Sequence, residues 1–421
     1  MLSRRLLLQA GGVALLEATL PQWGQASPLL VRPKDAFGRA RLQAKFGDTH
    51  AHCRFCDGEP MVGFSGHITE PALVAQAGLA TNHYFLITPH AEQLSTEDVE
   101  VLVRLSAQLE ADGQLFDWGM EWTGIPDEGS PAPLDPAYVK AGGHVLILRS
   151  SETIGHHVQG GEPQVRAGTY RELLDRVVER PWMQLVFPHP ELYGVETTWD
   201  GFAPPPDARL IRQGVGCELS SHGPRGYQGP GDVSKGVRAS NEAGWRLLLR
   251  RRWRPGPFGS TDRHLYPYEP GPWTVAFLET PPHGRPFTID HVYQAFAGRR
   301  VCFSEAAGAY ARLVGWFDEV TTNVALMGDT IAPRGHRELW VAADLESPVP
   351  VESIQLIVVA AEEAQDITLT TSRLDVNPRA FGDVFSVLTL KKLGAVAVYA
   401  KVRLADRNHS QLVTAPLFLE W

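Results

Sequence analysis

Two histidines separated by one residue, His50 and His52, are the first histidines in the sequence, and imidazole is a common metal ligand. If they lie on a strand, both point to the same side, because successive side chains of a strand face opposite ways. Asp48 and Asp57 flank the pair. Two histidines at this spacing also occur by chance on protein surfaces, so the interpretation depends on the rest of the chain.

The same stretch contains Cys53 and Cys56, whose spacing is also that of a redox or zinc motif. A zinc knuckle requires a second cysteine pair, and the two other cysteines, Cys217 and Cys302, are far apart. A redox pair remains an alternative in an oxidising compartment. We interpret the two cysteines as neighbours of a metal site rather than as its ligands.

Imidazole and carboxylate side chains recur where predicted strands end, which is where an α/β barrel places its chemistry. They are His90, Glu121, His144, His189, Asp262 and His264. Such a ligand set suits zinc, manganese or iron. Two or three divalent transition metal ions close together can generate a hydroxide and polarise a substrate oxygen.

The elements that must position these residues follow from the hydrophobic pattern. Residues 43 to about 305 alternate short apolar runs with helical patterns, the order of an α/β fold with parallel strands. The clearest strand patterns lie at residues 144–149, 183–188, 215–219 and 274–278. Apolar residues at helical spacing predict a helix over residues 96–112, which Ser95 would cap and Gly113 would end. A second helix is predicted over residues 289–298.

The pattern changes near Gly335, after which no helical period is visible. Strand-like runs lie at residues 338–343, 353–360, 385–390 and 395–404. We therefore expect a small C-terminal β-sandwich over residues 335–421, with residues 323–333 as the linker.

Length and composition limit the classes of function. The chain has 421 residues, which favours one large domain and a smaller one. Its net charge of -9 argues against general binding to nucleic acid, which requires a positive surface.

The first residues are typical of an export signal. Arg4 and Arg5 precede an apolar run over residues 10–16, a pattern that resembles a twin-arginine signal peptide. The run is too short to span a bilayer permanently, and the small residues near Ala26 provide a cleavage site. We expect residues 1–26 to engage the twin-arginine export machinery, giving a periplasmic or secreted protein without stable membrane insertion. The alternative is an uncleaved amphipathic start.

The segment 46–58 resembles the opening motif of the polymerase and histidinol phosphatase (PHP) metallohydrolases, in particular a branch similar to carbaryl hydrolase. Later segments resemble further motifs of that family in the same order: 87–92, 119–123, 143–146, 188–190, 218–223 and 259–264. Segments 296–300 and 414–418 also resemble that branch. The similarity therefore spans nearly the whole mature chain.

This resemblance implies a distorted (β/α)7 PHP-type barrel over residues 43–322 that carries a three-metal centre. The implied ligands of the first ion are His50, His52, Glu121 and Asp262. Glu121 would bridge to a second ion held by His144 and His189, while the third would be held by Asp57, His90 and His264. The chain departs from the family at Pro89, where an aspartate is usual, so we expect altered support at the third ion.

The leading hypothesis is a metal-dependent hydrolase in which a hydroxide generated at the ions attacks a phosphoester. Hydrolysis of a carbamate, ester or amide by the same centre is the closest alternative. A non-catalytic exported binding protein on a degenerate PHP scaffold is another. His222 would donate a proton to the leaving group or to a substrate oxygen; the alternative is that it is only a turn residue. Arg263 would hold an anionic group of the small-molecule substrate.

Overall fold

The structure of the protein is a computed structural model. It describes residues 42–55, 70–124, 143–155, 162–190, 205, 207–220, 239–263, 268, 270–318, 324–372 and 380–421. The chain divides into two units, Met1–Arg32 and Pro33–Trp421. The predicted signal peptide lies outside the described residues, and so do Asp57, His222 and His264. Within the described ranges, no helix is both long enough and apolar enough to cross a membrane.

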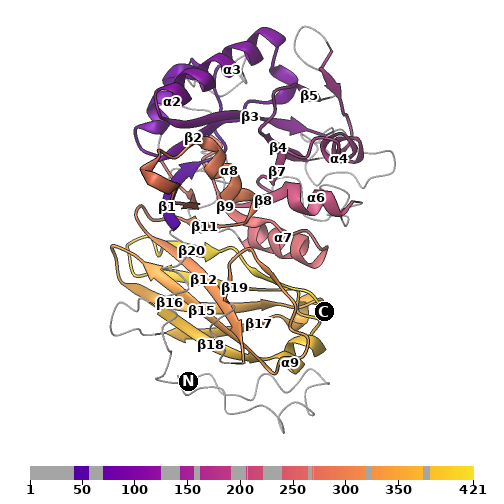
Figure 1. Ribbon diagram of the computed structural model, residues 1–421, viewed down its shortest axis with the longest axis vertical. Helices are drawn as coiled ribbons and strands as arrows, with labels where there is room; N and C mark the ends of the chain where they lie inside the picture. The colour runs from indigo at the N-terminus through magenta and orange to yellow at the C-terminus, as the bar shows by residue number, and fades with distance from the viewer. Residues whose placement is uncertain are drawn as a thin grey trace. The chain divides into compact units, whose positions relative to one another are not determined.

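The larger unit is a mixed α/β structure built on one long sheet (Figure 1). The strands of its N-terminal part are β1 (Leu42–Asp48), β2 (Tyr84–Ile87), β3 (Leu115–Thr123), β4 (His144–Leu148), β7 (Gln184–Phe187), β8 (Gly214–Ser220) and β9 (Gly256–Gly259). They lie side by side in this order, and β10 (Trp273–Glu279) and β11 (Val301–Ser304) continue the sheet beyond β1. A separate two-stranded sheet consists of β5 (Ile154–Gly155) and β6 (Val165–Arg166).

Strand directions are mixed, which corrects the expectation of parallel strands. β4 is antiparallel to both of its neighbours, β3 and β7, and β1 is antiparallel to β10. A buried strand has a continuous apolar pattern whichever way it runs, so the sequence carried no signal of direction. The α/β class is confirmed, whereas the direction of β4 was wrongly predicted.

The last strand of the series, β9, returns to contact β10. Thr274 Oγ1 donates to the carbonyl of Gly259 at 2.8 Å and accepts from its N–H at 3.0 Å. Among the described residues no backbone ladder joins these two strands. A closed barrel is therefore not shown, and the (β/α)7 barrel stays a prediction.

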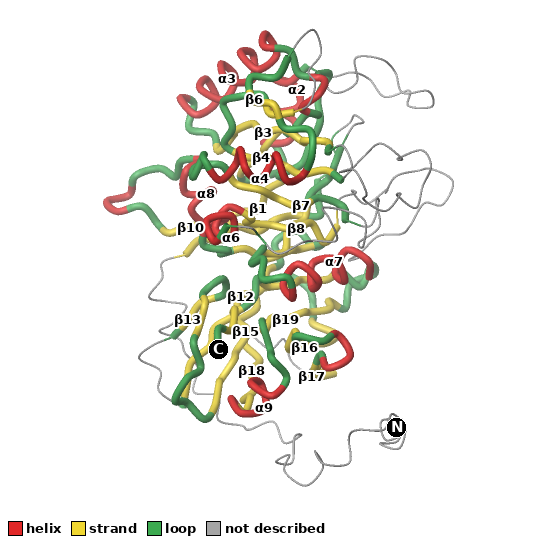
Figure 2. Tube along the Cα trace, turned by 90° about the vertical axis from the view of Figure 1, so that its right-hand side faces the viewer, coloured by secondary structure: helices red, strands yellow, loops and turns green. Residues whose placement is uncertain are grey.

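Helices accompany the N-terminal strands (Figure 2). They are α2 (Pro71–Leu79), α3 (Thr96–Ala111), α4 (Tyr170–Val178), α6 (Ala208–Gln213), α7 (Ala239–Arg250) and α8 (Ile289–Ala297), with short 3-10 turns at Ala91–Gln93 and Pro282–Gly284. Both predicted helices are confirmed as α3 and α8. Ser95 caps α3 by accepting from Asp98 N at 3.2 Å, and Gly113 adopts φ +74° just beyond the helix end, a value that glycine allows.

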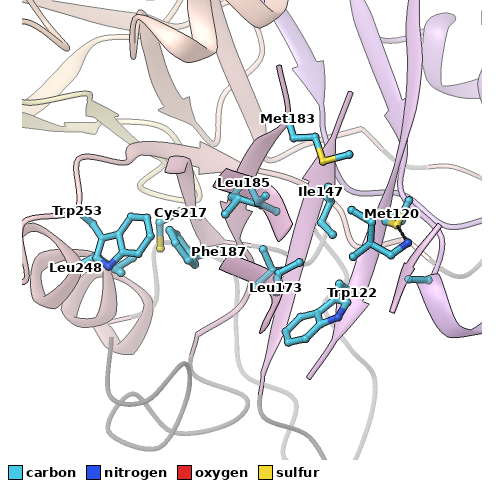
Figure 3. Packing of buried hydrophobic residues seen from close by; sticks show 14 of the residues in the cluster. Met120, Trp122, Ile147, Leu173, Met183, Leu185, Phe187, Cys217, Leu248 and Trp253 are labelled. Carbon is cyan, nitrogen blue, oxygen red and sulfur yellow. Dashed lines mark hydrogen bonds between the residues drawn. The ribbon is translucent and has the colours of Figure 1, made fainter. Parts of the chain in front are cut away.

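One face of the sheet carries a large apolar cluster (Figure 3). The strand register places Met120, Ile147 and Leu185 opposite one another on β3, β4 and β7, and all three are fully buried with Leu173 of α4. Neighbouring side chains of a strand point to opposite faces. Glu121, next to Met120, therefore points away from this cluster.

The C-terminal part is predominantly β-structure. Its strands are β12 (Tyr310–Phe317), β13 (Ala325–Leu326), β14 (Thr330–Ile331), β15 (Glu338–Glu346), β16 (Val351–Val359), β17 (Ile367–Ser372), β18 (Ala380–Ser386), β19 (Ala397–Leu404), β20 (Gln411–Thr414) and β21 (Leu417–Leu419), with a 3-10 turn at Glu363–Gln365. Strands β13, β12, β15 and β18 form a second sheet. It packs closely on the long sheet, since a Cβ atom added to Gly315 would lie 2.6 Å from Leu417 Cδ1.

Two expectations for this part need correction. The predicted strand at residues 385–390 is instead the end of β18 followed by the short helix α9 (Val387–Lys392). Val387 and Leu390 are both buried, and their separation of three residues fits a helix face as well as a strand run. The expected linker contributes β13 and β14, which pair with β12 and β21.

The long sheet continues from the N-terminal strands into the C-terminal ones. β11 pairs with β20, and β20 pairs with β19. Residues 43–322 and 335–421 thus share one sheet, and their division into separate domains remains a prediction.

Candidate metal centre

Four predicted ligands from three places in the chain meet within hydrogen-bonding distance of one another. His50 Nε2 lies 3.1 Å from His52 Nε2. Asp262 Oδ1 lies 3.4 Å from the first nitrogen and 3.0 Å from the second. Glu121 Oε2 lies 3.4 and 3.5 Å from the same two nitrogens. We call His50, His52, Glu121 and Asp262 the first subsite.

These separations fit a single ion. Nitrogen and oxygen ligands bound to zinc at about 2.0–2.1 Å in a tetrahedron lie roughly 3.3 Å from one another. The five distances printed above, from 3.0 to 3.5 Å, scatter around that value. The donor set, two imidazoles and two carboxylates, is also one that divalent transition metals accept.

A second group of imidazoles surrounds the same glutamate. His144 Nδ1 lies 2.5 Å and His189 Nε2 lies 2.9 Å from Glu121 Oε1. His90 Nδ1 lies 3.1 Å from Glu121 Oε2. We call His90, Glu121, His144 and His189 the second subsite.

In the structure His90 lies beside Glu121 and His144. The resemblance grouped it with Asp57 and His264 at a third ion. In the structure His90, Glu121 and His144 have ligand atoms within 4.8 Å of one another. Asp57 and His264 lie outside the described residues, so the third ion stays a prediction.

Glu121 is placed to bridge the two subsites. One of its oxygens faces His144 and His189, and the other faces the first subsite and His90. The buried Oε2 atom accepts no well-aligned hydrogen bond from the described residues, although imidazole nitrogens surround it. A carboxylate oxygen in this situation fits a metal ligand better than a hydrogen-bond acceptor.

The backbone holds the first subsite together. Asp262 N donates to His50 O at 2.7 Å, and His52 N donates to Arg263 O at 3.0 Å. The carboxylate of Asp48 accepts from the N–H groups of His50 and Thr261 at 3.0 and 3.1 Å. The segments after β1 and β9 are thereby fixed to each other, which brings the histidine pair against Asp262.

The backbone of Pro89 supports the bridging glutamate, Glu121. Glu121 N donates to the carbonyl of Pro89 at 2.8 Å, and Thr88 N donates to Ala51 O at 2.9 Å. The segment before His90 therefore contacts both the histidine pair and the bridging glutamate. A proline can fill this role because only its carbonyl is used.

Two of the ligand residues have left-handed backbones. His189 has φ +25° and Asp262 has φ +46°. Such conformations cost of order 1–3 kcal/mol for residues other than glycine and persist where the surroundings impose them. Their occurrence at two ligands is consistent with a site whose geometry is set before any ligand binds.

The charges in the cluster depend strongly on one another. Burial opposes the charged form of His50, but the carboxylates of Asp262, Glu121 and Glu218 outweigh it and raise the pKa of His50 well above its ordinary value. Burial also disfavours the charged form of Glu121, yet His144, His50 and His90 hold the pKa of Glu121 well below its usual range. Every ion-pair partner of Glu121 in the described part of the chain is a histidine.

The two subsites differ in their access to solvent. His50 and Glu121 are 0% and 1% exposed, whereas the side chains of His90 and His144 are each 14% exposed. His90 and His144 are thus the most exposed of the predicted ligands that the structure describes.

Glu218 is a residue of the site that sequence reasoning missed. Its Oε1 atom lies 3.0 Å from His50 Nδ1, and the carboxylate is fully buried. The sequence did contain a signal of this contact. Glu218 is an acidic residue in the middle of the apolar run of β8, and a buried carboxylate needs a polar partner. Of the two catalytic candidates, Arg263 contributes a backbone carbonyl beside His52, and His222 lies outside the described residues.

Comparison of the chain with family models, curated proteins and solved structures gave no match. The arrangement of the side chains is therefore what supports a metal centre.

Proposed function

We propose that the protein is a metal-dependent hydrolase whose centre holds at least two divalent transition metal ions and acts on a phosphoester. The observation that carries this proposal is the position of Glu121, whose two carboxylate oxygens face two different groups of imidazoles. Carboxylates that bridge two ions are a feature of hydrolytic metal centres.

His50, His52, Asp262 and Glu121 would hold one ion, and Glu121, His144, His189 and His90 the other. When bound, such ions activate water and stabilise the charge that develops on substrate oxygens. The residues themselves would fix the positions of the ions, and the burial of His50, His52 and Glu121 would keep water from that side.

Charge balance does not decide between the substrates. Two divalent ions carry four positive charges, and the ionised carboxylates of Glu121, Asp262, Glu218 and Asp48, in or beside the first subsite, carry four negative charges. The choice of a phosphoester therefore rests on the resemblance of the sequence motifs to PHP metallohydrolases.

A substrate screen tests the choice of bond. Purified protein loaded with zinc, manganese or iron would be assayed on aryl phosphates, aryl carbamates and aryl carboxylic esters. We expect turnover of a phosphate, and loss of that turnover in Asp262→Ala with the fold retained. Turnover of carbamates or esters alone would replace the phosphoester assignment, and absence of turnover with absence of metal uptake would favour the binding-protein alternative.

We also propose that the chain has a PHP-type barrel and is exported through the twin-arginine machinery. The order of the sequence motifs supports the first, and Arg4 and Arg5 before an apolar run support the second. Cell fractionation of wild type and of a double Arg4→Lys, Arg5→Lys variant tests export. The wild type should reach the periplasm or medium and the variant should stay inside the cell.

A further inference from the structure

The fully buried carboxylate of Glu218 accepts hydrogen bonds from three directions. Ser260 Oγ donates to Oε1 at 2.6 Å, and the same oxygen lies 3.0 Å from His50 Nδ1. His189 N donates to the other oxygen, Oε2, at 3.2 Å. Glu218 thus contacts one ligand of each subsite without pointing at the space between the ligands.

We infer that Glu218 is a positioning residue that orients His50 and His189 for metal binding in both subsites. The inference rests on the proposed metal centre and adds to it a residue that is not itself a ligand. It follows from what each of the two contacts does to its partner.

The contact with His50 selects the tautomer. A carboxylate only accepts hydrogen bonds, so it keeps the proton of the neutral imidazole on Nδ1. The lone pair of Nε2 then faces His52, Asp262 and Glu121, as an ion in the first subsite requires. A carboxylate behind a ligating imidazole also makes the ring a stronger ligand.

The contact with His189 supports a strained backbone. His189 has φ +25°, and its N–H is bound by Glu218 Oε2. This bond holds the backbone in the conformation from which the imidazole reaches Glu121 Oε1 at 2.9 Å. One side chain therefore sets the direction of ligands on both sides of the bridging glutamate.

A glutamine at this position cannot satisfy both contacts. Glu218→Gln keeps the size of the side chain but offers one carbonyl oxygen and one amino group. If the amino group faces His50, it drives the proton to Nε2, which blocks metal binding. If it faces His189, it meets an N–H donor and leaves that N–H without a partner.

The test is a zinc titration of the full chain, combined with the visible spectrum of the cobalt-loaded protein. We expect Glu218→Gln to weaken zinc binding about 10- to 100-fold and to change the cobalt spectrum per bound ion. Asp117→Asn is the matched control. Asp117 is also a largely buried carboxylate of β3, but it lies four residues before Glu121 along the strand and accepts from Ser106 and Tyr293.

The outcomes separate this inference from the proposed function. If wild type binds zinc and Glu218→Gln matches it in affinity and spectrum, the positioning role is overturned while the metal centre stands. If wild type binds no metal, both are overturned. If Asp117→Asn weakens binding as much as Glu218→Gln, the effect is a general one of altering a buried carboxylate and the positioning role fails.

Should Glu218→Gln fail to fold, Ser260→Ala provides a milder variant. It removes one donor to Glu218 Oε1 and leaves the His50 contact in place. We expect zinc binding to weaken about fivefold, the effect of one lost hydrogen bond. An unchanged dissociation constant would contradict the inference.

Discussion

Two of the buried polar clusters among the described residues are held together in different ways. At the metal centre, Glu121 is surrounded by imidazoles. In the second cluster, between α7 and the C-terminal strands, Glu242 pairs with Arg246 and Lys401, each at 2.6 Å. Asp366 pairs in the same cluster with Arg250 at 2.6 Å.

The difference lies in where the positive charge comes from. Arginine and lysine stay charged at any ordinary pH, so the second cluster is neutralised by its own side chains. Imidazoles are neutral near pH 7 unless their surroundings charge them. The centre around Glu121 therefore needs either protons or metal ions, whereas the cluster around Glu242 needs neither. The second cluster thus shows that burial of charged groups alone does not mark a binding site.

The largest effect on activity is expected from removing the charge of the bridging carboxylate of Glu121. Glu121→Gln should lower activity at least about 100-fold, beyond the loss typical of residues that only support ligands, because both subsites lose a carboxylate oxygen. Elemental analysis of the variant should show a loss of bound metal. Circular dichroism should show an unchanged fold. Full metal content in this variant would mean that Glu121 is not a bridge.

Metal should stabilise the protein only through the cluster around Glu121. Zinc at about 100 times its dissociation constant should raise the free energy of unfolding by roughly 2.7 kcal/mol for one site. Denaturant unfolding with and without zinc measures this. Glu121→Gln should lose most of the gain, and Glu242→Gln should keep it. An equal gain in both variants would show that zinc acts elsewhere.

Breaking the second cluster should affect stability and leave metal binding intact. Glu242→Gln removes the partner of two cations and should lower the free energy of unfolding by about 2–4 kcal/mol at pH 7. Its zinc dissociation constant should equal that of wild type. Chemical denaturation and zinc titration of the same preparation test the two statements separately.

The difference in unfolding free energy between wild type and Glu242→Gln should depend on pH. Burial disfavours the charged form of Glu242, but Lys401 and Arg246 outweigh it and lower the pKa of Glu242 below its ordinary value of 4.5. A carboxyl group with a lowered pKa stabilises the fold fully above the unfolded value and loses this contribution as pH falls through the folded value. The gap between wild type and Glu242→Gln should thus be constant near neutral pH and shrink below about pH 4.5. A gap that widens in acid would contradict this assignment.

The smallest effect is expected for an ion pair in solvent. Arg104 and Glu100 pair at 3.4 Å on α3, with side chains 69% and 63% exposed. Arg104→Ala should change the free energy of unfolding by less than about 0.5 kcal/mol, because water screens the pair. Denaturant unfolding at low and high salt measures it. A loss of unfolding free energy as large as that of Glu242→Gln would mean that burial does not explain the difference between the two ion pairs.

Sequence patterns predicted the local elements well and their directions poorly. α3 has the predicted start at Thr96, because the cap at Ser95 and the apolar spacing act within one segment. The antiparallel course of β4 depends on which strands it joins, and nothing in residues 144–148 encodes that. The helix α9 was missed because a short apolar run satisfies both a strand and a helix.

The ligand types of the site and the grouping of the first subsite could be predicted, but the contact of His90 with Glu121 and the role of Glu218 could not. His50, His52, Glu121 and Asp262 come together as expected. His90 lies with Glu121 and His144, which depends on how the segment after β2 meets β3. Glu218 escaped notice because its partner, His50, is 168 residues away in sequence.

The most direct test of the central claim is the metal content of the purified full chain, measured by elemental analysis after loading and dialysis and compared with that of Glu121→Gln. We predict at least two divalent ions per chain in the wild type and a clear loss in the variant. A wild type that retains no transition metal, or a variant that retains as much as the wild type, would contradict the account.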